Sequence, residues 1–220
     1  MKKKLLIFGT GDLAQLANYY FSKENIYNIV AFVVHQKYLS NNFFEEKPVV
    51  AFEAIAEDYP ANEFTIFIAI GYNEMNSVRE KIYYQVKKMG YSLATYISPQ
   101  CTYLSNFIPG DNTFIFEDNT IQPFVTIGSN VIIWSGNHIG HHSIIDSHNF
   151  ISSHVVISGH CIVEPNCFIG VNATIGNNVK IAKKSLIGAG SVITKDTEQC
   201  GVYVPAKSVK LEKKSNEINL

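Results

Sequence analysis

The stretch FIGVNATIGNNVKIAKKSLIGAGSVIT, residues 168–194, carries a branched aliphatic side chain at every sixth position. A small or compact residue stands two positions before almost every one of these side chains. A helix repeats every 3.6 residues and a strand every two, whereas a triangular prism of short strands can repeat every six. The same spacing extends back to residue 115 and occupies fourteen consecutive positions, namely Ile115, Ile121, Ile127, Ile133, Ile139, Ile145, Ile151, Ile157, Val163, Ile169, Ile175, Ile181, Ile187 and Ile193. The sequence therefore predicts a left-handed parallel β-helix over about residues 113–194, with aliphatic side chains inside and the small residues turning the corners.

The N-terminal half has a different periodicity, in which short apolar runs alternate with helical patterns. Residues 4–8 form an apolar run that ends at a glycine turn, and residues 12–21 follow with apolar side chains at helical spacing. Further strands are expected at 28–34, 48–52, 64–70 and 92–97, and helices at 53–58 and 75–89. This alternation indicates a parallel α/β sheet of Rossmann-like type. We expect a Rossmann-like domain over residues 1–97, a β-helix domain over 98–206 and a polar tail over 207–220.

Composition and charge argue against several classes of protein. The chain is 46% hydrophobic and 17% charged, with a formal net charge of -1, which argues against disorder and against nucleic-acid binding as a main activity. Gly9, Gly11 and Asp12 interrupt the first apolar run too early for an export signal. No apolar stretch approaches the roughly 18 residues needed to span a bilayer. The four cysteines have no CxxC spacing, so we expect reduced thiols in a cytoplasmic protein.

Six of the seven histidines lie between residues 138 and 160. Four of them, His142, His148, His154 and His160, stand three positions after a repeat aliphatic residue, whereas His141 stands two positions after Ile139 and His138 directly precedes it. A scattered polar surface is one interpretation of these histidines, and a purely structural β-helix remains an alternative. A metal site is a second interpretation, but successive members of the series rotate around the prism, so no metal is expected. A general base is the third interpretation, because imidazole titrates near neutral pH.

Several short segments, in order and spacing, are similar to those of a known family. They are GTGD at 9–12, IAIGYN at 68–73, the hexapeptide repeats, GAGSV at 188–192 and VPA at 204–206. The chain thereby resembles the bacterial nucleotide-amino-sugar N-acetyltransferases, a family also linked to sialic-acid O-acetyltransferases. The resemblance implies an N-terminal domain for a nucleotide-linked sugar, a β-helix for acetyl-CoA, and a homotrimer.

The resemblance also implies roles for residues of the β-helix. His141, in the segment HIGHH at 138–142, occupies the position of the catalytic base. The family's acidic residue after the base is replaced by His142, and Asn137 and Asp146 are possible substitutes that would orient His141. The acyl-CoA cleft is expected to include Ser152, Gly159 and Gly188, with the Gly159 N–H stabilising an oxyanion. Phe150 departs from relatives that carry a histidine there. Cys161 and Cys167 share the phase of small interior residues and are read as such.

In the N-terminal half, a glycine turn before a helix presents free N–H groups that favour a phosphate. The full GxGxxG pattern is not completed, since Ala14 takes the last position, and His35 follows the second strand where an NAD site would have an acid. A purely structural turn is equally compatible with these residues. The resemblance favours a nucleotide-sugar site that includes Gly9, Gly11, Asp12, His35, Gly71 and Asn73.

Together these features predict an acetyl-CoA-dependent N-acetyltransferase that acts on the amine of a dTDP-, UDP- or GDP-linked amino-dideoxy sugar. A sugar O-acetyltransferase and a non-catalytic nucleotide-sugar-binding protein remain alternatives. No nucleic-acid or membrane partner is expected.

Overall fold

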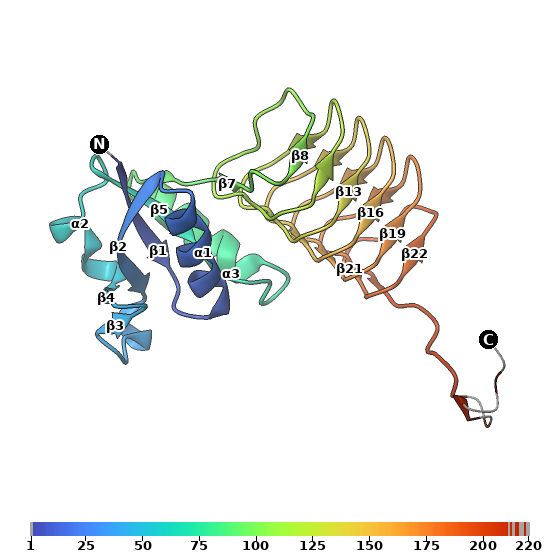
Figure 1. The fold of residues 1–220 in the computed structure, drawn as a ribbon, viewed down its shortest axis with the longest axis horizontal. Coiled ribbons are helices and arrows are strands. Elements are labelled where there is room, and N and C mark those ends of the chain that lie inside the picture. The colour runs from blue at the N-terminus through green and yellow to red at the C-terminus, as the bar shows by residue number, and fades with distance from the viewer. Residues whose placement is uncertain (1, 211, 213, 216–217, 219–220) are drawn as a thin grey trace.

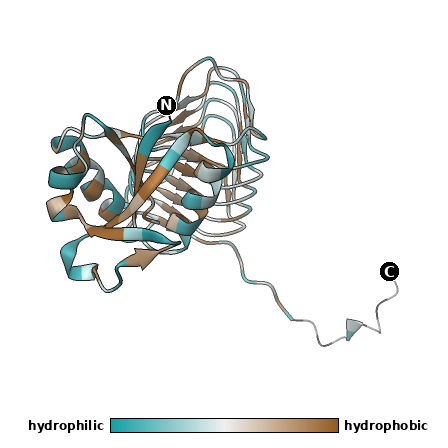
Figure 2. Cartoon of the chain, turned by 60° about the vertical axis from the view of Figure 1, so that its left-hand side comes forward, coloured by the Kyte–Doolittle hydropathy of each residue, from teal (hydrophilic) through white to brown (hydrophobic). Residues whose placement is uncertain are grey.

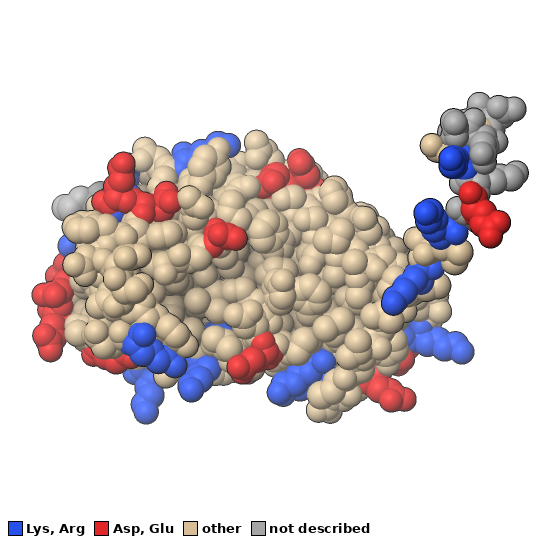
Figure 3. All heavy atoms as spheres, turned by 90° about the horizontal axis from the view of Figure 1, so that it is seen from below, with Lys and Arg blue, Asp and Glu red and all other residues tan. Residues whose placement is uncertain are grey.

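The computed structural model describes residues 2–210, 212, 214, 215 and 218. It contains a parallel sheet with helices, built from the first 93 residues, that lies beside a long prism of stacked coils (Figure 1). In the described part of the chain, no helix is long and apolar enough to cross a membrane. Acidic and basic side chains are scattered on the face shown in Figure 3, and neither sign dominates it.

The N-terminal sheet has the strand order β3-β4-β2-β1-β5-β6, parallel except for the β3–β4 pair. Its strands are β1 (Lys3–Phe8), β2 (Tyr27–Val34), β3 (Phe43–Phe44), β4 (Lys47–Ala51), β5 (Phe64–Ile68) and β6 (Ser92–Leu93), and its helices are α1 (Asp12–Lys23), α2 (Ile55–Asp58) and α3 (Ser77–Lys88), with 3-10 turns at Gln36–Tyr38 and Phe52–Ala54. Alternate residues of β1 face opposite sides: Leu5 and Ile7 pack with α1, while Leu6 and Phe8 pack with α2 and α3. The apolar strands lie between more polar helix surfaces (Figure 2). The sheet thus has an apolar layer on each face.

Among the sequence-predicted boundaries that differ from the structure, two affect how the sheet is connected to the prism. The expected strand at 92–97 is divided: β6 completes the sheet, while β7 (Tyr96–Ile97) pairs with a strand of the prism. The helix expected from residue 75 begins at Ser77, because Glu74, Met75 and Asn76 all have positive φ angles, which a right-handed helix excludes. The left-handed backbone conformation of the loop before α3 therefore could not be predicted from hydrophobic periodicity.

The C-terminal part is a parallel β-helix with three faces of two-residue strands. One face contains β8 (Thr102–Tyr103), β10 (Thr120–Ile121), β13 (His138–Ile139), β16 (Val156–Ile157), β19 (Thr174–Ile175) and β22 (Val192–Ile193). A second contains β11 (Thr126–Ile127), β14 (Ile144–Ile145), β17 (Ile162–Val163) and β20 (Lys180–Ile181). The third contains β7, β9 (Phe114–Ile115), β12 (Ile132–Ile133), β15 (Phe150–Ile151), β18 (Phe168–Ile169), β21 (Leu186–Ile187) and β23 (Val202–Tyr203).

The register of these strands confirms the predicted repeat. His138 pairs with Val156 and Ile139 with Ile157, so one coil takes 18 residues. All fourteen repeat aliphatic side chains are buried, and thirteen of them are at most 5% exposed. The interior is therefore a continuous aliphatic column along the axis, as expected for a solenoid whose coils stabilise their neighbours.

The corners of the prism are formed by different residues from those expected. The small residues two positions before each aliphatic side chain are buried inside with it. Each turn instead depends on the residue three positions after the aliphatic one, which has a positive φ angle from Asp118 to Gly190. Asn, Asp, His and Gly tolerate that left-handed conformation better than other residues do. His142, His148, His154 and His160 are therefore corner residues, which explains why four histidines share one phase.

The two parts of the molecule are joined by a buried guanidinium. Arg79 of α3 is fully buried, and its Nη atoms donate hydrogen bonds to four carbonyls: Gly71 (2.7 Å), Asn149 (3.0 Å), Asn130 (3.3 Å) and Ile70 (3.4 Å). Burial lowers the pKa of Arg79 to about 9, so it remains a cation at neutral pH. Two of these carbonyls belong to the loop before α3 and two to the β-helix, so one side chain fixes α3 against the coils.

Candidate active site

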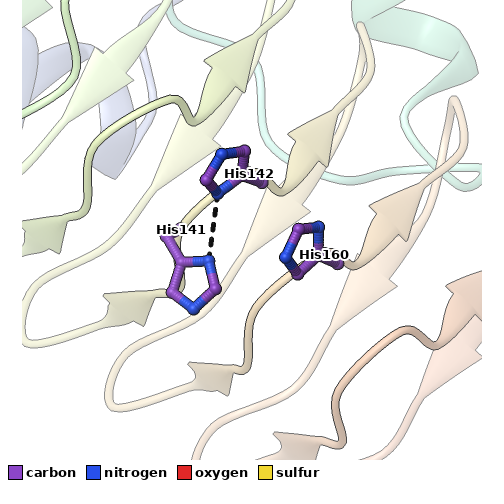
Figure 4. Close-up of side chains that lie close together, drawn as sticks. All are labelled: His141, His142 and His160. Atoms are coloured by element: carbon purple, nitrogen blue, oxygen red, sulfur yellow. Dashed lines mark hydrogen bonds between the residues drawn. The ribbon is translucent and has the colours of Figure 1, made fainter.

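Three histidine side chains meet at one corner of the β-helix (Figure 4). His141 and His142 follow β13, and His160 follows β16 on the next coil. The Nδ1 atoms of His141 and His142 are 3.1 Å apart. The His142 and His160 rings stack with centroids 4.8 Å apart, and the His141 ring lies edge-on to both. All three side chains are exposed to solvent.

The position of His141 is fixed by its neighbours on adjacent coils. Its N–H donates to Gln122 Oε1 at 2.8 Å, and its carbonyl accepts the N–H of His160 at 2.9 Å. Its imidazole lies against Gly159, where a Cβ atom would be 2.7 Å from His141 Cε1 and 2.9 Å from Nε2. Only glycine leaves room for the ring in this place. Because Nδ1 is bonded to His142, Nε2 is the nitrogen that remains for a substrate proton.

Asn137 is not placed to orient His141, contrary to one sequence-based expectation. Its Oδ1 accepts the N–H of Val155 at 2.7 Å, and its Nδ2 donates to the carbonyl of Trp134. Its own N–H donates to Asn119 Oδ1 at 3.0 Å. Asn137 is therefore a buried member of a hydrogen-bonded column inside the prism. It stands two positions before a repeat aliphatic residue, like the other interior small residues, and this position in the repeat could have predicted its burial.

Asp146 lies at a different corner, after β14. Burial raises the pKa of its carboxyl group, and the nearby Glu164 carboxylate raises it further. The side chain hydrogen-bonded to the His141 ring is instead that of His142.

The residues expected to hold acetyl-CoA are divided between two corners. Gly159 is beside His141, but its N–H already donates to Asn177 Oδ1 at 3.0 Å. Ser152 and Gly188 follow β15 and β21 on the third face, two coils apart, and a Cβ at Gly188 would be 3.1 Å from the carbonyl of Tyr203. The structure thus brings only Gly159 to the histidine cluster, and its N–H can bind an oxyanion only after Asn177 moves.

The buried cysteines lie inside the prism. Cys161 and Cys167 are fully buried, and all four cysteines are free thiols. Burial raises the pKa of Cys167 to about 12 and also raises that of Cys161. A nucleophilic cysteine needs access and a lowered pKa, so these thiols are packing residues.

A separate cleft of about 1190 Å³ lies at the carboxyl ends of β1, β2 and β5. In open parallel sheets, ligands bind at the carboxyl ends of the strands, at the point where the strand order reverses. In this sheet the order reverses at β1. Three of the six residues expected from the sequence line the cleft: Gly9, His35 and Asn73. Gly9 has a φ of 122°, and a Cβ there would be 2.8 Å from the Ala69 carbonyl, so glycine is required.

The other three expected residues lie outside the lining of this cleft. Gly11 precedes α1 and Asp12 is its first residue. The carbonyl of Gly71 accepts a hydrogen bond from Arg79, so Gly71 belongs to the joint between the two parts.

The cleft also contains charged residues that the sequence analysis did not single out. Lys37 and Lys81 supply two cationic groups, and Glu53 and Glu74 supply two acids. His35 Nδ1 is 2.9 Å from Glu53 Oε1, and the N–H of Gln36 donates to Oε2 at 2.9 Å. Burial alone would raise the pKa of the Glu53 carboxyl, but these hydrogen bonds lower it below its usual value. Lys37 could have been found from its position just after the second strand, whereas Lys81 could not, because lysines on exposed helix faces are common.

Residues 160–195 match the family model described as bacterial transferase hexapeptide (six repeats). No curated protein matches the chain in sequence. Among solved structures, the acetyltransferase domain of PglB from Neisseria gonorrhoeae FA1090 has a TM-score of 0.78 at 21% identity, over 90% of this chain and 94% of that one.

Two other structures are equally similar. A mutant of perosamine N-acetyltransferase from Caulobacter crescentus, in complex with CoA and GDP-perosamine, has a TM-score of 0.79 at 20% identity, over 90% of this chain and 92% of that one. WeeI from Acinetobacter baumannii AYE has a TM-score of 0.76 at 18% identity, over 92% and 94%. The chain therefore has the fold of these proteins along nine-tenths of its length and contains a bacterial transferase hexapeptide repeat within its β-helix.

Proposed function

We propose that this protein is an acetyl-CoA-dependent N-acetyltransferase that acts on the amine of a nucleotide-linked amino-dideoxy sugar, with His141 as general base. The observation that carries the proposal is the placement of His141, whose ring lies against Gly159 with Nδ1 bonded to His142 and Nε2 uncommitted. Structures of the same fold include one in complex with acetyl coenzyme A and one with CoA and GDP-perosamine. These complexes support acetyl-CoA as the donor and a nucleotide-linked amino sugar as the acceptor.

In the proposed mechanism, the neutral sugar amine attacks the thioester carbonyl directly. The C–N bond forms, the C–S bond breaks, and the amine proton passes to His141 Nε2 and then to the departing thiolate. The mechanism assigns the proton of this hydrogen bond to His141 Nδ1 with His142 Nδ1 as acceptor, which leaves Nε2 unprotonated and stabilises the imidazolium that follows. No acyl-enzyme is required.

The nucleotide-sugar site in this proposal is the cleft of the N-terminal, Rossmann-like domain, residues 1–97. Gly9, His35 and Asn73 line it, and Lys37 and Lys81 offer positive charge for a diphosphate. All lining residues come from the stretch between Phe8 and Gln85, so the β-helix of the same chain, residues 98–206, supplies none of them.

We propose a homotrimer in which the cleft of one chain faces the histidine corner of another, because the cleft and that corner share no residue within one chain. The outer faces of the β-helix expose Val156 (40%), Ile162 (38%) and Val192 (69%), which association would cover. Sedimentation should give a trimer at micromolar concentration, and a monomer would contradict this assembly. We also propose a cytoplasmic location, since the four cysteines have no CxxC spacing.

A thiol-release assay with acetyl-CoA and a panel of dTDP-, UDP- and GDP-linked amino sugars tests the activity. We expect release of CoA with at least one amine acceptor, and the panel identifies the nucleotide. His141→Ala and His141→Asn should lower kcat by about 10²–10⁴-fold while acetyl-CoA still binds. His154→Asn, at another corner, is the matched control.

Two results would contradict these assignments. Absence of CoA release with any amine or hydroxyl acceptor would exclude the enzyme. Near-normal turnover by His141→Ala would move the base to His142 or His138.

A further inference from the structure

The histidine corner has a second chemical capacity that the proposed reaction does not use. One ring nitrogen from each of His141, His142 and His160 lies within 4.8 Å of the other two. A tetrahedral zinc ion with Zn–N bonds of about 2.0–2.1 Å holds its ligand atoms roughly 3.3 Å apart. The Nδ1 atoms of His141 and His142, at 3.1 Å, already have that spacing. The remaining separations need to shrink by at most about 1.5 Å, which rotation of exposed side chains allows.

The backbone fixes the starting points of these ligands. His142 and His160 occupy equivalent left-handed corners, with φ angles of 60° and 57°, one 18-residue coil apart. The N–H of His160 is bonded to the carbonyl of His141, which ties the third residue to the other two. Three side chains from two adjacent coils therefore start from a fixed backbone, so only the side chains must be ordered on binding.

The surroundings favour a borderline-soft ion. The donor set is three imidazoles with no carboxylate, which suits Zn²⁺, Cu²⁺, Ni²⁺ or Co²⁺ rather than Mg²⁺ or Ca²⁺. The ring of Phe124, 4.6 Å from that of His142, forms an apolar wall on the preceding coil. All three histidines are exposed, so a fourth coordination position faces solvent.

We propose that His141, His142 and His160 bind one divalent transition-metal ion, with zinc as the reference metal, and that the bound ion blocks His141. A neutral imidazole has one free lone pair, so a metal ion on His141 Nδ1 leaves the ring proton on Nε2, which then cannot accept the proton of an amine. Occupancy and catalysis therefore exclude each other at His141. The inhibitory consequence rests on the proposed function, but binding itself does not.

The test is metal binding to the full chain after chelator treatment and dialysis. Co²⁺ is titrated first, because its visible absorption reports coordination, and Zn²⁺ is then added to displace it. We expect one ion per chain. His160→Asn keeps a residue that suits the left-handed corner but removes one ligand, so it should weaken Zn²⁺ binding by at least about tenfold, as loss of even an outer-sphere partner does.

His154→Asn is the matched control, because it makes the same substitution at an exposed left-handed corner outside the cluster. Its Zn²⁺ affinity and stoichiometry should equal those of the wild type. Absence of stoichiometric binding, or equal affinity in His160→Asn and wild type, would overturn the proposal. So would full acetyl transfer by the zinc-saturated protein, since the ion would then not be on His141. A protein that binds zinc but acetylates no sugar would reject only the proposed function.

Discussion

At the scale of single residues, the candidate site depends on the absence of a side chain at Gly159 and on the contact between His141 and His142. Gly159 has no side chain, and that absence gives the His141 ring its place between coils. His142 combines two roles, since it forms a left-handed corner and contacts His141 Nδ1. The corner residue His142 therefore directly follows the candidate base His141 because the corner conformation brings the two rings into contact.

We expect Gly159→Ala to reduce kcat strongly while the fold is retained. The new Cβ would be 2.7 Å from His141 Cε1, so the ring must move from its position. A displacement of about 1 Å can cost on the order of 10²-fold in rate. Steady-state kinetics measure the loss, and thermal unfolding checks the fold.

Gly176→Ala is the control for this prediction. It makes the same substitution in the next coil, where a Cβ would meet nothing closer than 3.4 Å. Equal kcat values for Gly159→Ala and Gly176→Ala would show that the position of His141 in the structure is not the one used in catalysis.

At the scale of elements, the six-residue period could be predicted because every coil repeats the same local interaction. The aliphatic column was visible in the sequence from Ile115 to Ile193, and the structure buries all of it. The corners were assigned to the wrong position of the repeat, although Asn, Asp, His and Gly recur at the correct one. The 18-residue coil also predicts that His142 and His160 stack one coil apart, and the structure confirms it with ring centroids 4.8 Å apart. The edge-on contact of His141 with both rings was not predicted, because His141 stands at a different position of the repeat.

We expect the corner position to tolerate asparagine and to reject β-branched residues. His154→Val places a β-branched side chain at a φ of 58°, which His and Asn adopt more readily than β-branched residues do. The left-handed conformation costs L-residues roughly 1–2 kcal/mol, so the free energy of unfolding should fall by up to that amount in His154→Val, whereas His154→Asn should leave it nearly unchanged. Denaturant titration measures both variants.

His138→Val provides the comparison at a strand position. His138 lies on the outer face of β13 and pairs with Val156, so valine already occurs in that column. A loss of stability in His138→Val as large as that in His154→Val would mean that removal of the imidazole, and not the corner geometry, is responsible.

At the scale of the whole molecule, the two parts are held together by contacts that no local pattern predicts. Arg79 looks like an ordinary helix residue in the sequence, yet it is fully buried against carbonyls up to 70 positions away. Beside it, a column of side chains links the two parts. The N–H of Ile68 in β5 donates to Asn112 Oδ1 at 2.7 Å, Asn112 Nδ2 donates to Asn130 Oδ1 at 2.7 Å, and Asn130 Nδ2 lies 2.8 Å from His148 Nδ1.

This column has a fixed direction, because it starts from a backbone N–H that can only donate. Asn130 therefore presents its amide hydrogens to His148, so Nδ1 must be an acceptor and the ring must be neutral. His148 is only 4% exposed, and its Nε2 faces the hydroxyl of Tyr84 at 3.3 Å and Glu80 Oε1 at 3.7 Å. Burial lowers the pKa of His148, the nearby Glu80 opposes this shift, and the positive charges of Arg79 and Lys183 add to it.

The joint between the two parts should therefore weaken in acid. Since the pKa of His148 is lower in the folded protein than its unfolded value of about 6.5, the unfolded chain binds more protons as the pH falls below that value. The stability that His148 contributes is present above pH 6.5 and is lost as the pH falls towards the lowered pKa.

We expect His148→Asn, which suits the left-handed corner and continues the asparagine column, to show a smaller loss of unfolding free energy between pH 7.5 and 5.5 than the wild type. Urea titrations at both pH values measure the difference, with His154→Asn as the control at an exposed corner. An identical pH dependence in wild type and His148→Asn would show that another group controls the acid sensitivity of the joint.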